Sequence, residues 1–142
     1  MKRSYTSFIW FRKIQEMEFR YARHTQNIES VIDFYTSVLS FDILGRFNAH
    51  DGYDGVFLGF EGENWHLEFT QNSEKPQSKF DEDDALVFYP ENQKDVDEIL
   101  ENLKTLKIPL IETKNPYWNN KAFCFEDCDH YKVIISTEKI QK

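Results

Sequence analysis

The chain contains few of the residues that mark fibrous, linker-like or disulfide-stabilised proteins. Its 142 residues include 5 glycines, 4 prolines and 2 cysteines. So little glycine and proline excludes a collagen-like or low-complexity chain. The cysteines, Cys124 and Cys128, lack a second pair with which to build a structural zinc site. Such sparse cysteine is typical of a reducing compartment, and we expect a cytoplasmic protein.

Long apolar runs and an excess of positive charge are also missing. The longest apolar run near the start covers residues 8–11 and is followed at once by Arg12. A bilayer span takes about 18 apolar residues, and the core of a secretory signal takes about 7 or more. With 25 acidic and 17 basic residues, the formal net charge is −8. A nucleic-acid binder needs a basic face, so we expect neither a membrane nor a nucleic acid as partner.

Apolar and aromatic residues are plentiful. Hydrophobic residues make up 40% of the chain and aromatic residues 16%, including 13 Phe. A chain of this composition can bury a core, which excludes general disorder. The length suits one compact domain, or two small halves that share a core.

The first half of the chain predicts a strand, a helix and three strands. Strands are expected at residues 19–24, 41–47, 56–60 and 65–70, and a Gly-rich turn at residues 50–55. Asn27 is a suitable N-cap for the helix. The apolar residues that follow recur at helical spacing: Ile28, Val31, Ile32, Tyr35, Val38 and Leu39.

The same order of elements is predicted again in the second half. After a polar linker, a strand is expected at residues 85–89, then a helix with an apolar stripe from Val96 to Leu106 that Pro109 stops. Three short strands follow, at residues 110–112, 122–126 and 132–136. Residues 19–70 thus align with residues 85–136, and internal repetition of this kind indicates a duplicated unit.

This pattern predicts an α+β fold made of two βαβββ modules that form a cupped mixed β-sheet around a cavity. The modules cover residues 19–70 and 85–136, and residues 71–84 link them. Together with the C-terminal residues they form one domain over residues 19–142. Residues 1–18 are interpreted as an N-terminal extension.

Several segments resemble one protein superfamily. Residues 32–39 (IDFYTSVL), 65–70 (WHLEFT) and 125–131 (FEDCDHY) resemble motifs of the vicinal oxygen chelate superfamily of glyoxalases, bleomycin-resistance proteins and extradiol dioxygenases. Residues 50–56, 66–70 and 115–118 (NPYW) together are similar to its bacterial YycE-like subgroup. The resemblance implies the fold described above, and a small organic molecule as the ligand in the cavity.

The resemblance also implies four positions that usually hold a divalent metal. In this sequence they are Arg20, Glu68, Ala85 (or its neighbour Leu86) and Ile134. Of these, only Glu68 offers a ligand atom, while such sites take about three or four donors. Arginine is cationic at any working pH. We therefore expect no cofactor and no glyoxalase I activity, with a divalent metal at other residues as the alternative.

Three residues remain to supply polarity to the cavity. Strand alternation places His66 and Glu68 on one face, and Arg20 at the opposing position can pair with Glu68. In one interpretation Arg20 anchors an anion, and Glu68 or His66 is the catalytic general base. In the other, the pair satisfies itself and replaces a lost metal.

Two further groups are candidate ligand-binding residues. His50 and Asp54 flank the Gly-rich turn and either belong to a structural turn or bring His50 beside His66 and Glu68 as a displaced metal site. The loop residues Asn115, Tyr117 and Trp118 either cover an apolar ligand or pack on the edge of the barrel.

The leading hypothesis is a binding protein for a small organic molecule, without the usual metal ligands. Bleomycin-resistance proteins bind a cationic drug in an acidic groove and usually work as dimers, and the net charge of −8 is compatible with that. The alternative is a metal-dependent or acid–base lyase, isomerase or dioxygenase-like enzyme that uses Glu68 and His66. A domain that only associates with partners would instead expose an apolar patch. A homodimer is compatible with each hypothesis.

Overall fold

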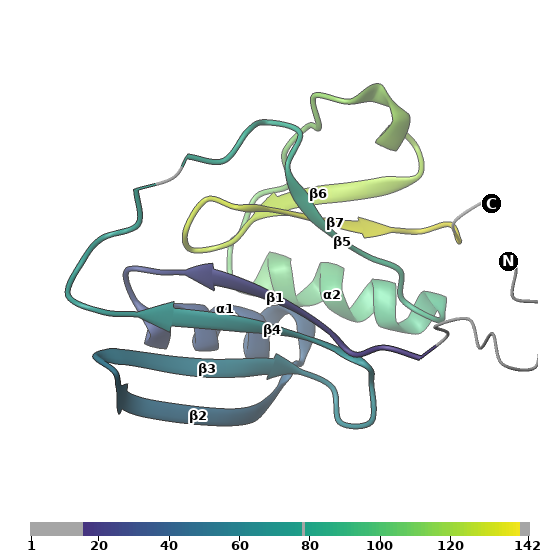
Figure 1. Ribbon diagram of the computed structural model, residues 1–142. Helices are drawn as coiled ribbons and strands as arrows, with labels where there is room; N and C mark the ends of the chain where they lie inside the picture. Colours follow the sequence, from purple (N-terminus) through teal and green to yellow (C-terminus); the bar gives the residue numbers. More distant parts are fainter. Residues whose placement is uncertain (1–15, 78, 140–142) are drawn as a thin grey trace, which may run out of the picture.

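Two α-helices and two β-sheets build the part of the chain that the computed structural model describes, residues 16–77 and 79–139 (Figure 1). Residues 1–15 of the predicted N-terminal extension lie outside the described residues. No helix in the described ranges is long and apolar enough to cross a membrane.

The first module forms a four-stranded sheet with one helix against it. Its elements are, in chain order, β1 (Phe19–His24), α1 (Ile28–Leu39), β2 (Asp42–His50), β3 (Tyr53–Gly59) and β4 (Trp65–Gln71). The strand order is β1-β4-β3-β2, with β1 parallel to β4 and the other pairs antiparallel. The Asn27 side chain accepts a hydrogen bond from the Ser30 amide at 3.1 Å, which confirms the predicted N-cap of α1. Ser40 ends the helix in the left-handed region, with φ of 59°.

The second module repeats this plan in shorter form. Its elements are β5 (Ala85–Phe88), α2 (Gln93–Thr105), the 3-10 helix η2 (Pro116–Trp118), β6 (Ala122–Glu126) and β7 (Lys132–Ser136). The strand order is β5-β7-β6, with β5 parallel to β7 and β6 antiparallel to it. The predicted α+β class and the two βαβββ-like modules are confirmed, and the hydrogen bonding divides the mixed β-sheet into two.

Three local predictions are wrong. The strand expected at residues 110–112 is reduced to an isolated bridge between Ile111 and Cys124, since the preceding Pro109 cannot donate to a ladder. Helix α2 ends at Thr105, before Pro109, because Lys107 has a φ of 60° that an α-helix cannot continue through. The turn expected at residues 50–55 is shorter than predicted. It comprises Asp51 and Gly52, because strands β2 and β3 remain paired as far as His50 and Tyr53.

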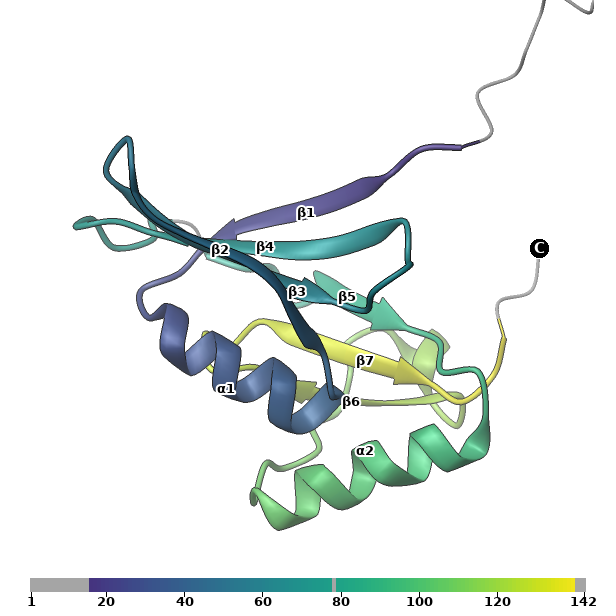
Figure 2. The same ribbon diagram turned by 90° about the horizontal axis from the view of Figure 1, so that it is seen from below.

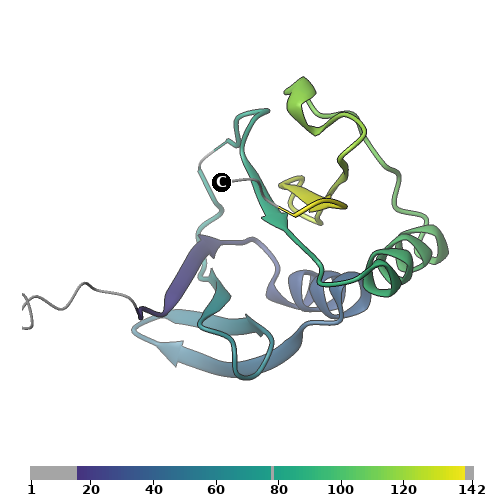
Figure 3. The same ribbon diagram turned by 90° about the vertical axis from the view of Figure 1, so that its right-hand side faces the viewer.

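The hydrophobic core lies on both sides of α1. One side of the helix packs on β3 and β4 through Phe69 and its neighbours, and the other reaches the second sheet, where Phe34 and Phe125 have ring centroids 6.0 Å apart. Figure 2 shows α1 below the first sheet and beside the ends of strands β6 and β7. Helix α2 lies beside α1, and the Asn102 side-chain amide donates to the Val38 carbonyl at 3.1 Å. The two sheets spread away from this pair of helices (Figure 3).

Candidate functional site

A pocket of about 680 Å³ lies between the two modules. Strands β1 and β4 line it from the first module, and β5 and the start of α2 line it from the second. Its volume is within the range of small-molecule sites, about 300–1,000 Å³. Seven aromatic residues line it: Phe19, Tyr21, Phe41, Phe60, Trp65, Phe88 and Tyr89.

Phe41 is the centre of the aromatic lining. It follows Ser40 at the end of α1, and its ring centroid lies 5.1 Å from Phe60, 5.7 Å from Trp65 and 5.5 Å from Phe88. Trp65 begins β4 and Phe88 ends β5, so these ring contacts join the two modules. Phe41 is 5% exposed, whereas Phe60 and Tyr89 are 39% and 37% exposed and lie at the mouth of the pocket.

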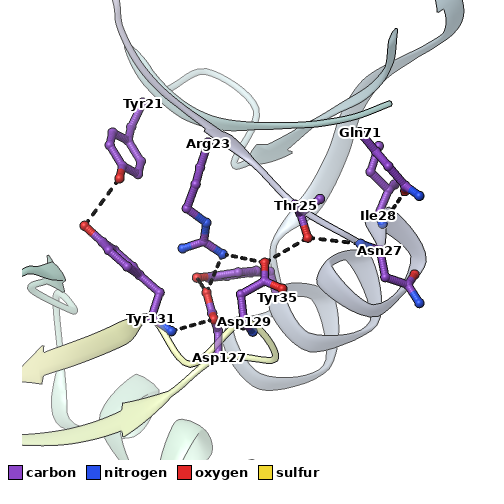
Figure 4. A network of polar contacts seen from close by, with 10 residues as sticks. All are labelled: Tyr21, Arg23, Thr25, Asn27, Ile28, Tyr35, Gln71, Asp127, Asp129 and Tyr131. Atoms are coloured by element: carbon purple, nitrogen blue, oxygen red, sulfur yellow. Dashed lines mark hydrogen bonds and ion pairs between the residues drawn. The ribbon is translucent and has the colours of Figure 1, made fainter. Parts of the chain in front are cut away.

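A buried polar network holds the same two modules together, shown in Figure 4. We call Arg23, Thr25, Tyr35, Asp127 and Asp129 the Arg23 network. The Arg23 Nη2 donates to Asp127 Oδ2 at 2.7 Å and to Asp129 Oδ2 at 3.2 Å. The Tyr35 hydroxyl donates to Asp127 at 2.7 Å, and the Thr25 hydroxyl donates to Asp129 at 2.8 Å. The network therefore ties β1 and α1 to the turn between β6 and β7.

The chemistry of this network follows from burial. Arg23 is 7% exposed and Asp127 is 4% exposed. Burial is the largest single influence and opposes the charged form of Arg23, but the charge and hydrogen bond of Asp127 together with the contributions of Tyr35 and Asp129 outweigh it, so that the pKa of Arg23 is raised. The Arg23 guanidinium carbon also lies 4.8 Å from the centre of the Phe69 ring and 4.7 Å from that of Tyr131. Burial, and then the Asp127 charge, raise the pKa of Tyr35 well above its ordinary value.

The predicted pair of Arg20 and Glu68 is formed, but it does not line the pocket. Arg20 Nη1 donates to Glu68 Oε1 at 3.0 Å. The pair lies on the outer face of the first sheet, because Tyr21 and Leu67, the alternate residues of β1 and β4, face the helix and the pocket. The Arg20 guanidinium carbon lies 5.3 Å from the centre of the Phe57 ring.

His66 is the one predicted site residue among those that line the pocket in the described part of the chain. Its ring also packs edge-on against Phe57, with centroids 5.4 Å apart. His66 therefore lies between the pocket and the outer face that carries Arg20 and Glu68.

The two residues that flank the β2–β3 turn are placed as parts of the hairpin. Asp54 Oδ1 accepts a hydrogen bond from the amide of Ala49, whose φ is 52°, at 2.9 Å, and thereby stabilises the hairpin end. The His50 side chain is 78% exposed and stacks edge-on against Phe47. Among the described residues, no three His, Cys, Asp or Glu side chains are grouped so as to hold a metal. His50, His66 and Glu68 are thus not brought together.

Asn115, Tyr117 and Trp118 form and flank the short helix η2, away from the pocket. The Asn115 side chain accepts from the Tyr117 amide at 3.0 Å and caps the helix. The Tyr117 ring packs on Trp118 and lies 3.9 Å from the Lys121 ammonium. None of the three lines the described pocket.

The four positions at which the sequence resemblance implies metal ligands can be compared with the donor atoms that a divalent ion needs. Arg20 donates to Glu68, which already uses one carboxylate oxygen in that ion pair. Ala85 and Leu86 have no donor atom, and Ile134 is an apolar residue only 4% exposed. A divalent ion needs several N, O or S ligands, so these residues do not fit one.

Sequence reasoning missed the residues that join the modules. Strand alternation from Tyr21 places Arg23 on the core-facing side of β1, and a buried arginine requires a carboxylate partner. The segment 125–131 offered Asp127 and Asp129 for this role. The pocket residues Phe41 and Phe88 could not be assigned to a site in this way, because in the sequence they are indistinguishable from ordinary core residues.

Comparison with known proteins places the chain among relatives of one kind. It matches the family models of the YycE-like N-terminal domain over residues 19–70 and the YycE-like C-terminal domain over residues 83–137. It is 34% identical over 130 residues to the uncharacterized protein YycE of Bacillus subtilis (strain 168), and the match covers 91% of this chain and 94% of that protein.

Solved structures agree with the match to these family models and to the Bacillus subtilis protein. A crystal structure of a YycE protein of unknown function from Bacillus subtilis superposes with a TM-score of 0.76 at 33% identity, covering 88% of this chain and 92% of that one. The trypanothione-dependent glyoxalase I of Leishmania major has a TM-score of 0.67 at 20% identity, covering 86% of each chain. The fosfomycin resistance protein FosX from Mesorhizobium loti has a TM-score of 0.64 at 11% identity, covering 90% and 95%. At such low identity these last two share the fold alone.

We expect Asp127→Asn to destabilise the protein strongly. The change leaves the buried Arg23 without its anionic partner, and removing one partner of a buried ion pair lowers the free energy of unfolding by about 3–5 kcal/mol. Glu29→Gln is the matched control, because Glu29 pairs with Arg46 at the same 2.7 Å but the two side chains are 69% and 39% exposed. The control should lose less than about 1 kcal/mol in urea unfolding. Equal losses in the two variants would contradict the role of the Arg23 network.

We also expect stability to fall at alkaline pH through Tyr35. A raised pKa in the folded state means that the neutral hydroxyl is favoured by folding, so its contribution is complete below the ordinary tyrosine value of 10.0 and is lost as pH rises above it. Urea unfolding between pH 8 and pH 11 should show a smaller alkaline loss in Tyr35→Phe than in the wild type. Tyr117→Phe, which changes a 49% exposed tyrosine, should behave as the wild type. The same alkaline loss in all three proteins would show that Tyr35 is not responsible.

Proposed function

Since the chain belongs to the YycE-like family of the vicinal oxygen chelate superfamily, we propose that it binds a small organic molecule in the pocket between its two modules. The observation that supports this is the pocket itself, about 680 Å³ in volume and lined by seven aromatic residues. Membership of a fold family does not define a ligand. The proposal therefore rests on the shape and chemistry of the pocket.

The pocket has the features expected of a binding site. Aromatic side chains supply large apolar contact areas, and Phe60 and Tyr89 at the mouth remain more than a third exposed, which leaves apolar surface for a ligand to cover. Ser40 adds a polar group among apolar neighbours, whereas the His66 ring packs on Phe57 at the outer face. A few polar groups in a mostly apolar cavity are typical of small-molecule sites.

The proposal includes binding without a divalent metal. Arg20 and Glu68 form an ion pair at two of the four positions that the superfamily uses for metal ligands, and the other two positions carry apolar side chains. The guanidinium supplies the positive charge that a metal would otherwise place beside Glu68.

A second candidate function rests on that same ion pair. Glu68 is 9% exposed, the Arg20 side chain is 51% exposed, and both lie on the open outer face of the first sheet close to Phe57. An accessible guanidinium beside a carboxylate can bind an anionic substrate while the carboxylate moves a proton. In this acid–base enzyme, changes at Arg20 and Glu68 would abolish substrate binding or turnover, and changes in the pocket would not.

We expect the neutral fluorophore N-phenyl-1-naphthylamine to bind in the pocket, with enhanced emission. Phe60→Ala and Tyr89→Ala each remove a half-buried aromatic ring at the mouth and should weaken binding by about fivefold or more, since apolar burial stabilises by roughly 25 cal/mol per Å². The measurement is a fluorescence titration.

Arg20→Gln is the control for this titration, because Arg20 does not line the pocket. Its affinity should equal that of the wild type. Loss of binding in Arg20→Gln with unchanged binding in Phe60→Ala would favour the outer face and contradict the proposal. Far-UV circular dichroism of each variant verifies that it is folded.

We further expect the protein, purified without chelator, to contain no stoichiometric divalent metal by elemental mass spectrometry. The reason is the lack of a fitting donor set at Arg20, Glu68, Ala85 and Ile134. Near-stoichiometric metal that is lost in both Glu68→Ala and His66→Ala would contradict the metal-free proposal and support the enzymatic candidate.

A further inference from the structure

The mouth of the pocket carries exposed aromatic side chains. Phe19 is 63% exposed, Phe60 39% and Tyr89 37%, and all three line the pocket. Met17, two residues before Phe19, is 65% exposed. Single exposed apolar residues are ordinary on a protein surface, whereas several around one opening are typical of a surface that another segment or molecule covers.

Acidic side chains surround the same opening. Glu63 lies in the turn between β3 and β4, Glu91 follows β5, and Asp95 and Glu98 lie on the first half of α2. Glu91 lies 3.8 Å from the Lys139 ammonium, which offsets its charge. The described lining of the pocket includes no lysine or arginine. A segment that covers this opening is therefore favoured if it combines apolar and basic residues.

The chain itself contains a segment of this composition, just before the part that the structure describes. Residues 1–15 include four basic residues and no acidic one: Lys2, Arg3, Arg12 and Lys13. Within them, residues 8–14 (FIWFRKI) place two of the basic residues among apolar and aromatic ones. The chain as a whole has a net charge of −8, so this basic stretch is a local exception. Its charge is opposite to that of the pocket mouth.

The chain enters the described fold at the edge of the pocket. The Phe19 amide donates to the Asn64 carbonyl at 2.7 Å, and Asn64 follows Glu63 in the β3–β4 turn. An extended chain spans at most about 3.6 Å per residue, so Ile14 and Phe8 can lie up to about 18 Å and about 40 Å from Phe19. Residues 8–14 are thus long enough to cross the mouth of the pocket. Since they are tethered beside it, a weak intrinsic affinity suffices for docking.

We propose that residues 8–14 dock over the mouth of the pocket of their own chain. The aromatic residues of the segment cover Phe60 and Tyr89, and its basic residues, Arg12 and Lys13, lie near the acidic residues of the mouth. This docking goes beyond the proposed function, because it takes place without a ligand. It also uses the exposed rim of the pocket and requires no space among the packed rings below it.

Paramagnetic relaxation in the whole 142-residue chain tests the docking. Cys128→Ser removes the exposed thiol, while Cys124 is only 1% exposed, and Ser7→Cys then offers a single attachment site for a nitroxide spin label beside residues 8–14. The label broadens NMR signals of nuclei close to it. Without any ligand, the amide signals of Tyr89 and Glu98, which belong to the second module, should lose most of their intensity. Reduction of the nitroxide should restore them.

Three double variants of the spin-labelled chain separate apolar contact, local charge and overall charge. Trp10→Ser with Phe11→Ser should abolish the broadening at Tyr89 and Glu98, because the apolar contact is lost. Arg12→Gln with Lys13→Gln should reduce it, and added salt should reduce it in the parent protein as well. Lys2→Gln with Arg3→Gln is the matched control, since it removes the same charge outside residues 8–14. The control should keep the broadening of the parent.

A mixed sample separates docking within one chain from docking between two copies. Isotope-labelled protein without a spin label is combined with unlabelled, spin-labelled protein, and the signals of Tyr89 and Glu98 should keep their intensity. Broadening in this mixture would mean that the segment covers the pocket of a second copy, which overturns docking in its own chain.

The remaining outcomes are equally decisive. Full intensity at Tyr89 and Glu98 in the spin-labelled parent overturns the proposal, as does broadening that persists in Trp10→Ser with Phe11→Ser. Equal loss in the two charge variants overturns the assignment to residues 8–14, since the effect would then come from net charge alone. None of these results decides whether a small molecule binds in the pocket, because the fluorophore titration measures that separately.

Discussion

The arrangement of the two modules depends on one buried ion pair, between Arg23 and Asp127. An arginine removed from water is tolerated only where a carboxylate and further hydrogen bonds compensate for its lost hydration. Asp127 provides the carboxylate, and it also accepts from the Tyr35 hydroxyl, while the Thr25 hydroxyl donates to Asp129. Within the described residues Nε and Nη1 of Arg23 have no hydrogen-bond partner, and the guanidinium lies over the rings of Phe69 and Tyr131. Since Arg23 lies on β1 and Asp127 follows β6, the pair fixes one sheet relative to the other.

The pocket follows from this constraint. Its walls belong to different modules, with Trp65 on one and Phe88 on the other, and their distance is set by the way in which the modules are joined. The core around α1, where Phe34 packs on Phe125 of β6, also holds the two modules together. The pocket is therefore a consequence of packing between modules, whereas the outer face with Arg20 and Glu68 belongs to the first module alone.

The sequence predicted the fold well because helix and strand periods are local properties. The stripe of α1 and the strands β1, β6 and β7 lie where alternation and N-cap chemistry placed them. The ion pair of Arg20 and Glu68 was also predictable, because parallel pairing of β1 and β4 puts these residues on one face. The location of the pocket was not, since it arises between segments far apart in the chain. His50 and Asn115 likewise offered suitable chemistry, but their positions depend on a hairpin and a short helix that point them elsewhere.

The location of a bound ligand tests the central claim most directly. In NMR spectra of the isotope-labelled protein, titration with N-phenyl-1-naphthylamine should shift the amide and side-chain signals of Trp65, Phe88 and Ile99, which line the pocket. The signals of Arg20, Ala22 and Glu68 on the outer face should stay in place. Shifts concentrated at Arg20 and Glu68, with Phe88 and Ile99 unchanged, would contradict a binding site between the modules.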